Sequence, residues 1–381
     1  MLKTYTYKLQ QCDEARPNCH KCKNFGVTCN FNATIPDLQP SGAGSFRLAG
    51  CDGGDEASQT FLGITIPKFL YPPVVSSDHT SAFHLDRQCI ARLNRFQERT
   101  VLSIGAARTA NLYQEIAVRM ALSHPYLMHA VQTLTVNHER FMSRPVPPRT
   151  ATEIHHWSQA AVSFHQKLSL PIKPDDRDAL WATAALLGIM AFTSIDVSTP
   201  EDAWPFTSDA TQDLEWLNMS DGKVAVWNAT DPLRPDSVFA PIRDEYLHLY
   251  GGVTIEELFG INGIPQDFVQ LCQMNGLSCT KSNSYFAAVH SLAPLLRSEC
   301  NSTNATKFMS FLCRLSPEFK HLLQIKDPRA LLILCHWYAQ MRNYPWFVAR
   351  RARLEGHSIC LYLRRYCFKD TLIQDMVSVL E

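Results

Sequence analysis

The sequence has no net charge and lacks the signals of secretion or membrane insertion. It contains 36 lysines and arginines against 36 aspartates and glutamates, so any affinity for nucleic acid has to come from a local patch. Its first residues include no apolar segment of the kind a signal peptide needs. The longest apolar run, 179–195, is interrupted by Thr183, Gly188 and Thr193. We therefore expect a buried core helix there and no membrane span.

Catalytic motifs are also missing. The sequence has no P-loop, no G-x-G-x-x-G and no G-x-S-x-G. The carboxylates of Asp213 and Glu215 are two residues apart, a spacing that turns side chains to different faces of a helix. His124, His129 and His138 have no carboxylate pair at ligand spacing, so we expect ordinary helix histidines with hydrogen-bond partners. The chain is predicted not to be an enzyme.

Sustained period-two alternation, solenoid repeats and heptads are absent too, whereas apolar residues recur at helical intervals from about Ser77 onward. One helix is predicted to start around Pro125, with Ser123 as its cap, and to run to about Phe141. Further helices are expected at about 176–196, 210–219, 284–298, 316–325, 328–342 and 346–366. The predicted fold class is all-α.

Cysteine, in contrast, is plentiful, and four of the 13 cysteines stand close together near the start. They follow the spacing C-x6-C-x2-C-x6-C and comprise Cys12, Cys19, Cys22 and Cys29. Thiolates at such intervals, on a short polar segment, are what a structural Zn²⁺ site requires. The odd cysteine count and the missing secretory context favour a reducing compartment over disulfides.

This stretch resembles the second two-thirds of the fungal-type Zn2Cys6 DNA-binding cluster. Cys19, Cys22 and Cys29 match its second half, Pro17 falls in the connecting loop, and Cys12 matches the last cysteine of the first half. The first two cysteines and their basic run are missing. Two zinc ions with four ligands each need eight metal–sulfur bonds, whereas four cysteines with two bridging supply six. We therefore expect one Zn²⁺ at most, and a truncation or misplaced start codon.

The resemblance also indicates which residues approach DNA. In that family the basic run of the first half makes most base and phosphate contacts, and this chain retains only His20, Lys21 and Lys23 in the second half. These three are predicted to contact phosphates, which position a protein on double-stranded DNA without specifying sequence.

Composition and resemblance together divide the chain into three parts. Residues 1–31 form the partial zinc module, and the segment 32–76 is rich in Gly, Ser, Pro and Asp and is predicted to be a disordered linker. Residues 77–381 form an all-helical effector domain. Blocks beginning at Ser123, His156 and Asp327 resemble the sterol-uptake-control-like branch of these regulators, some members of which bind sterols.

The resemblance implies a zinc-dependent transcription regulator in the nucleus, controlling sterol or metabolic gene-cluster expression. Its partners would be DNA, the transcription machinery or other regulators, and a lipophilic ligand enclosed by the apolar helical domain. The alternative is a truncated interaction protein that acts through its helical domain without binding DNA. Two further expectations concern the C-terminal region. A group of arginines is expected to form a solvated helix face, with a partner-binding or phosphate-binding patch as the alternative; it comprises Arg350, Arg351, Arg353, Arg364 and Arg365. Four aromatic residues are expected in the core, namely Trp337, Tyr338, Trp346 and Phe347.

Overall fold

The computed structural model describes residues 59–61, 64–66, 74–75, 82–143, 145–207, 214–250 and 258–381. All of them belong to one compact unit, 58–381. Helices dominate it, as predicted. The α-helices are α2 (Arg87–Arg95), α3 (Ala107–Ala121), α4 (Pro125–Met142), α5 (Ala151–Leu168), α6 (Arg177–Thr193), α8 (Glu215–Thr230), α9 (Arg243–Tyr250), α10 (Gln266–Leu271), α11 (Phe286–Leu292), α12 (Ala305–Cys313), α13 (Pro317–Gln324), α14 (Pro328–Met341), α15 (Trp346–Tyr366) and α16 (Thr371–Ser378).

Shorter turns of helix connect them. A π-helical turn, Phe96–Thr100, continues α2, and 3-10 turns cover Val101–Ser103, Pro174–Asp176, Pro200–Asp202, Ala240–Ile242 and Leu295–Arg297.

Strand structure is limited, among the described residues, to two short antiparallel pairs. β1 (Gln59–Phe61) pairs with β2 (Ile64–Ile66), and β3 (Val74–Val75) pairs with β4 (Ala82–Phe83). Three of these strands lie in the segment 32–76, and the predicted domain boundaries stay predictions. β4 contributes to the interior of the unit, because its Phe83 is buried.

Local capping explains where several helices begin. Asp86, Thr150, Ser316, Asp327 and Asp370 each accept a hydrogen bond from a backbone N–H in the first turn of the helix that follows, which satisfies donors that lack an intrahelical partner.

Helix α4 begins differently from our prediction. Its N-cap is His124, with Pro125 in the first turn and no side-chain cap. The predicted cap, Ser123, is wrong. Its hydroxyl donates backwards to the carbonyl of Met120, at 3.2 Å.

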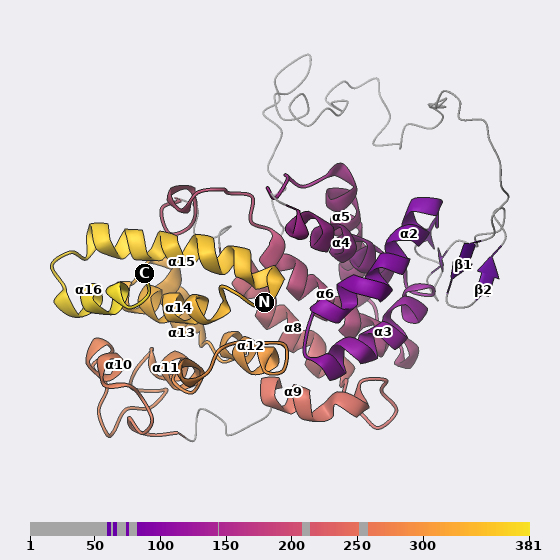
Figure 1. Cartoon of the computed structure of the whole chain (residues 1–381). Coiled ribbons are helices and arrows are strands. Elements are labelled where there is room, and N and C mark those ends of the chain that lie inside the picture. Colours follow the sequence, from indigo (N-terminus) through magenta and orange to yellow (C-terminus); the bar gives the residue numbers. More distant parts are fainter. Residues whose placement is uncertain are drawn as a thin grey trace, which may run out of the picture. The chain divides into compact units, whose positions relative to one another are not determined.

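The unit contains two hydrophobic cores. The N-terminal core is built mainly from α2, α3, α4 and the first three turns of α6. The C-terminal core is built mainly from α11 to α16, with α14 and α15 packed side by side (Figure 1). The end of α6 contributes Ala191 and Phe192 to this second core, and Ile189, Met219 and Trp346 contact both. Helix α6 therefore runs from one core into the other.

Burial of α6 follows from its sequence. It is apolar around most of its circumference, and twelve of its residues are buried; such a helix belongs inside a protein. The core helix expected at 179–195 is thus confirmed. Among the described helices, none has the length and apolar run that crossing a membrane takes.

Candidate functional site

The predicted zinc and DNA-contact residues lie outside the described residues. Cys12, Cys19, Cys22 and Cys29, and also His20, Lys21 and Lys23, precede the first described segment. Their roles stay predictions. Two other places in the helical unit have the geometry of a site: a cavity between the two cores, and a cluster of histidines beside β4.

The cavity lies where α6, α8 and α12 meet the start of α3. It is lined mainly by apolar residues, including Ile189 and Phe192 of α6, Met219 of α8 and Leu312 of α12. Its volume is about 140 Å³. An empty, apolar protein cavity of about 150 Å³ holds benzene, so the space fits a group of about one aromatic ring.

Lys223 of α8 is the one charged side chain among the described residues that line this cavity. Burial lowers the pKa of its ammonium, and the nearby Cys313 thiol acts in the opposite direction. The ammonium also lies 5.4 Å from the centre of the Trp181 ring, over its face, within the range of a cation–π contact. The cavity therefore combines an apolar wall with one basic group, the Lys223 amine.

Gly188 leaves space beside the side chain of Lys223, because it has no side chain of its own. It lies inside α6, where glycine costs about 1 kcal/mol relative to alanine. A Cβ at this position would lie 3.9 Å from Cδ of Lys223, so a methyl group fits but a longer side chain would occupy space beside the lysine. Gly188 is accordingly a position from which the cavity can be filled.

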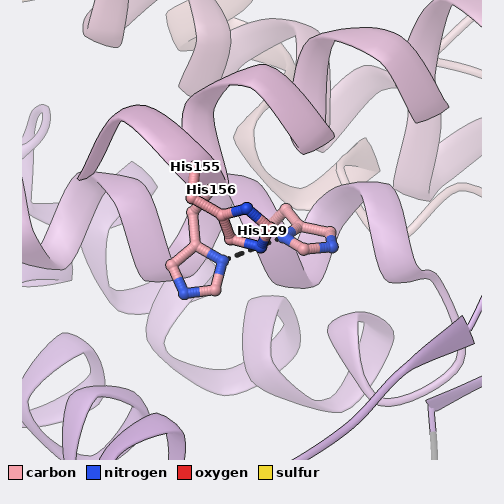
Figure 2. A group of neighbouring side chains, drawn as sticks. All are labelled: His129, His155 and His156. Carbon is pink, nitrogen blue, oxygen red and sulfur yellow. Dashed lines mark hydrogen bonds between the residues drawn. The ribbon is translucent and has the colours of Figure 1, made fainter. Parts of the chain in front are cut away.

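The histidine cluster joins α4 to α5 (Figure 2). His129 of α4 and His156 of α5 are buried, and their Nδ1 atoms lie 2.9 Å apart in a hydrogen bond. His155, the neighbour of His156, is exposed, yet one nitrogen from each of the three rings lies within 4.8 Å of the others. Phe83 of β4 packs against two of the rings, with its centre 4.7 Å from that of His129 and 5.7 Å from that of His156.

Both buried imidazoles are neutral at physiological pH. Burial, assisted by the other two histidines, lowers the pKa of His129 to about 3. Burial, then the Arg92 guanidinium and His155, lower the pKa of His156 to about 4, against the opposing effect of the Asp86 carboxylate. One Nδ1 therefore carries the proton that the other accepts.

The other predicted histidines have ordinary partners. His124 Nδ1 lies 2.8 Å from the carbonyl oxygen of Met120. His138 Nδ1 lies 3.0 Å from Oγ1 of Thr100, and its ring packs against Trp346. The expectation of satisfied helix histidines is confirmed for these two and also for His129, whose hydrogen-bond partner is His156.

The C-terminal arginines correct a prediction. Arg351 is buried, forms an ion pair with Glu355 and lies over the ring of Trp216. A solvated face is therefore wrong for this residue, because the Glu355 carboxylate on the next turn compensates its charge. The aromatic prediction is confirmed for Trp337, Tyr338 and Phe347, all of which are buried core.

Sequence analysis alone named His129 but missed the other two histidines of the cluster and the cavity lysine. Lys223 stands in a segment with no clear helical pattern, and Glu215 to Thr230 nevertheless form α8. His155 and His156 carry a weak signal, since two adjacent histidines on one helix are uncommon. Only packing α5 against α4 brings them to His129.

Comparison with known proteins gives one informative similarity. A curated protein of Gibberella zeae, described as a "Zn(2)-C6 fungal-type transcription factor", is 24% identical in an alignment covering 90% of this chain and 77% of that protein. No family model matches the sequence. The similarity supports transcription regulation for this chain, and it covers a far longer part of the chain than the length of the cysteine segment.

Proposed function

We propose that the chain is a zinc-dependent transcription regulator of the fungal Zn2Cys6 type that works in the nucleus. The observation that carries this proposal is the similarity, over 90% of the chain, to a protein described as a "Zn(2)-C6 fungal-type transcription factor". The helical unit and the cysteine spacing support it, because both are expected of such a regulator. Its targets would be sterol or metabolic gene clusters, as the sequence resemblance implies.

In this proposal the cysteine module binds one Zn²⁺ and holds the chain on DNA. Cys12, Cys19, Cys22 and Cys29 supply four thiolates, which complete one tetrahedral site. His20, Lys21 and Lys23 then contact phosphates. Metal binding and folding are a single event in small zinc modules, so the module would lose its structure when the metal is removed.

The first experiment tests the cysteine module by comparing the parent chain with a double variant and a control variant. Cys19 and Cys22 are both replaced with serine, and bound zinc is measured by elemental analysis while chromatin occupancy is mapped with an epitope-tagged chain. We expect the variant to lose one zinc per chain and its occupancy. Cys279→Ser is the matched control, since this thiol lies outside the module, on a turn. Unchanged zinc content and occupancy in the double variant would contradict the proposal.

The second experiment tests the DNA contacts through their salt dependence. Each phosphate contact contributes about −0.9 to the slope of log K against log salt concentration. Replacing Lys21 and Lys23 together with alanine should therefore flatten the slope by about 2, for all duplex sequences alike. If the variant and the parent had the same salt dependence, phosphate contacts by Lys21 and Lys23 would be excluded.

The alternative function is an interaction protein that uses only the helical unit. It predicts that the Cys19→Ser, Cys22→Ser variant keeps its associated proteins and its biological effect while parent and variant both fail to bind DNA. Purification of the tagged chain with its partners, done in parallel with the occupancy map, separates the two functions.

Ligand sensing is assigned to the cavity between the cores. Its apolar wall and the Lys223 ammonium fit a small molecule with one ring or a short chain and a carboxylate. A whole sterol is larger than this space and would require the cores to part. Toluene is a suitable probe of the apolar wall, and benzoate is a suitable probe of the wall together with the Lys223 side chain.

The test uses two variants. Gly188→Leu should abolish binding of both probes because it fills the cavity, whereas Gly188→Ala should retain it. Lys223→Met keeps the length of the side chain and should weaken benzoate binding without affecting toluene. Calorimetry that detects neither probe, or finds both unaffected by Gly188→Leu, would refute the assignment.

A further inference from the structure

We propose that His129, His155 and His156 form a binding site for a divalent transition metal, with Zn²⁺ as its occupant, that links α4 to α5. The site lies in the helical unit and is separate from the cysteine module in sequence. The proposal goes beyond gene regulation and does not depend on it.

The spacing of the three rings matches a shared metal ion. Imidazoles bound to one tetrahedral zinc, by Zn–N bonds of about 2.0–2.1 Å, have ring centres about 5.2 Å apart. The centres of His129 and His156 are 5.2 Å apart, those of His155 and His156 are also 5.2 Å apart, and those of His129 and His155 are 6.0 Å apart. The three rings thus lie close together (Figure 2), at separations near those around a shared ion.

The nitrogen atoms need only small movements. Ligand nitrogens on a tetrahedral zinc lie about 3.3 Å from one another. The Nδ1 atoms of His129 and His156 are 2.9 Å apart, and one nitrogen of each ring lies within 4.8 Å of the others. His155 is the exposed member, so its side chain is the one that can turn inward to close the remaining gap.

The donor set decides which metal fits. Three neutral imidazoles suit zinc, copper and nickel, whereas calcium and magnesium require oxygen ligands. To bind the ion through both Nδ1 atoms, the ring that carries the proton of the His129–His156 hydrogen bond has only to shift it to its own Nε2, so each imidazole stays neutral with one N–H. The exposed side of His155 leaves a position open to water, as in sites with three histidine ligands.

The surroundings hold the two buried rings in place. Phe83 contacts both of them, and orientation of ligating histidines by their neighbours is a general feature of metal sites. Two charges act on His156 in opposite directions, the Arg92 guanidinium and the Asp86 carboxylate. The Arg92 guanidinium is held by a hydrogen bond outside the cluster, since its Nε donates to Oε1 of Gln132 at 2.5 Å.

The deciding experiment compares bound zinc in the full chain and three variants. His129→Gln and His155→Gln each remove one ligand, and His165→Gln, at an exposed histidine of the same helix, is the matched control. After dialysis against metal-free buffer, we expect the two ligand variants to contain one zinc per chain fewer than the parent and the control. His155→Gln guards against misfolding, because its side chain is exposed.

A second readout identifies the ligands. Copper added at one equivalent should give an electron paramagnetic resonance spectrum with nitrogen couplings that decrease in His155→Gln but not in His165→Gln. Zinc at 100 times its dissociation constant should raise the melting temperature by about 5 °C in the parent and control alone.

Equal zinc content in the parent and both ligand variants would overturn the proposal, as would a copper spectrum that His155→Gln leaves unchanged. Zinc held by the cysteine module does not confuse the result. The same difference should persist when Cys19 and Cys22 are serine, whether or not the chain binds DNA.

Discussion

Replacing Glu153 with alanine should destabilise the helical unit by about 3–5 kcal/mol, because it leaves the charge of Arg140 buried without a counter-charge. The two side chains are only 2% and 4% exposed. Arg140 donates from Nε to Oε2 of Glu153 at 2.9 Å and from Nη2 to Oε1 at 3.0 Å. The pair connects α4 with α5, close to the start of α5.

The magnitude depends on the contacts that survive the substitution. Arg140 would keep the carbonyl oxygen of Thr193 as an acceptor, at 3.3 Å. Burial raises the pKa of the Glu153 carboxyl although Arg140 lowers it, so desolvation of the pair is expensive. Replacing both residues, as Arg140→Met with Glu153→Leu, removes both buried charges and should cost much less than Glu153→Ala alone.

The assay is urea unfolding followed by circular dichroism. With a denaturant dependence of about 3 kcal/mol per molar urea, Glu153→Ala should lower the midpoint by about 1 M or more. Asp196→Ala is the control, because Asp196 forms an ion pair with Arg149 but is 53% exposed; it should change stability by less than about 1 kcal/mol. A Glu153→Ala effect no larger than the control would refute the reasoning, as would a double variant less stable than either single one.

Three further predictions concern single positions. Asp327→Ala should cost about 1–2 kcal/mol in urea unfolding, since its Oδ1 accepts from Arg329 N at 3.1 Å and Ala330 N at 2.9 Å, and Asp327→Asn should cost less. Gly260→Ala should lose about 1–2 kcal/mol, because φ is +76° and the new Cβ would lie 3.1 Å from the carbonyl oxygen of Gly276. Burial lowers the pKa of His336 from 6.5 to about 4, so the folded state resists a proton that the unfolded state accepts. His336 alone should therefore cost the folded state about 1.4 kcal/mol for each unit that the pH falls from 6.5 to 4, in addition to what His129 and His156 contribute. His336→Gln should reduce the slope of unfolding free energy against pH by that amount, and an unchanged slope would contradict the prediction.

Much of the helical fold could be predicted from the sequence, because apolar periodicity is a local signal. The helices expected at about 176–196, 316–325, 328–342 and 346–366 correspond to α6, α13, α14 and α15 within a few residues. Pro125, Pro317 and Pro328 each stand in the first turn of a helix, where the missing N–H costs nothing.

Residues whose burial depends on a partner in another helix could not be found this way. Glu153 is buried because Arg140 lies across from it, thirteen residues away in the chain. Periodicity predicts a buried face of α5 around Trp157 and Phe164, yet Trp157 is only half-buried, whereas His156 and Lys167 are buried. Lys167 pairs with the carboxylate of Asp176, at 3.0 Å, a contact that no spacing rule reveals.

The histidine cluster shows the same limit. The sequence identifies His129 as a histidine on an apolar helix, and ligand spacing along the chain offers it no neighbours. The two histidines that reach it come from the next helix, and their approach is set by how α4 and α5 cross. The zinc and DNA contacts assigned to Cys12 through Cys29 stay predictions, as they lie outside the described residues.

The passage of α6 from one hydrophobic core into the other has a consequence for how this unit melts. The two cores are not independent of each other, since Ile189, Met219 and Trp346 contact buried side chains of both. If one core unfolded, apolar side chains at the boundary of the other would become exposed to water. Heating or denaturant should therefore unfold both cores in a single cooperative transition. For the same reason, a fragment ending between α9 and α10 should be an aggregation-prone species rather than a smaller stable protein.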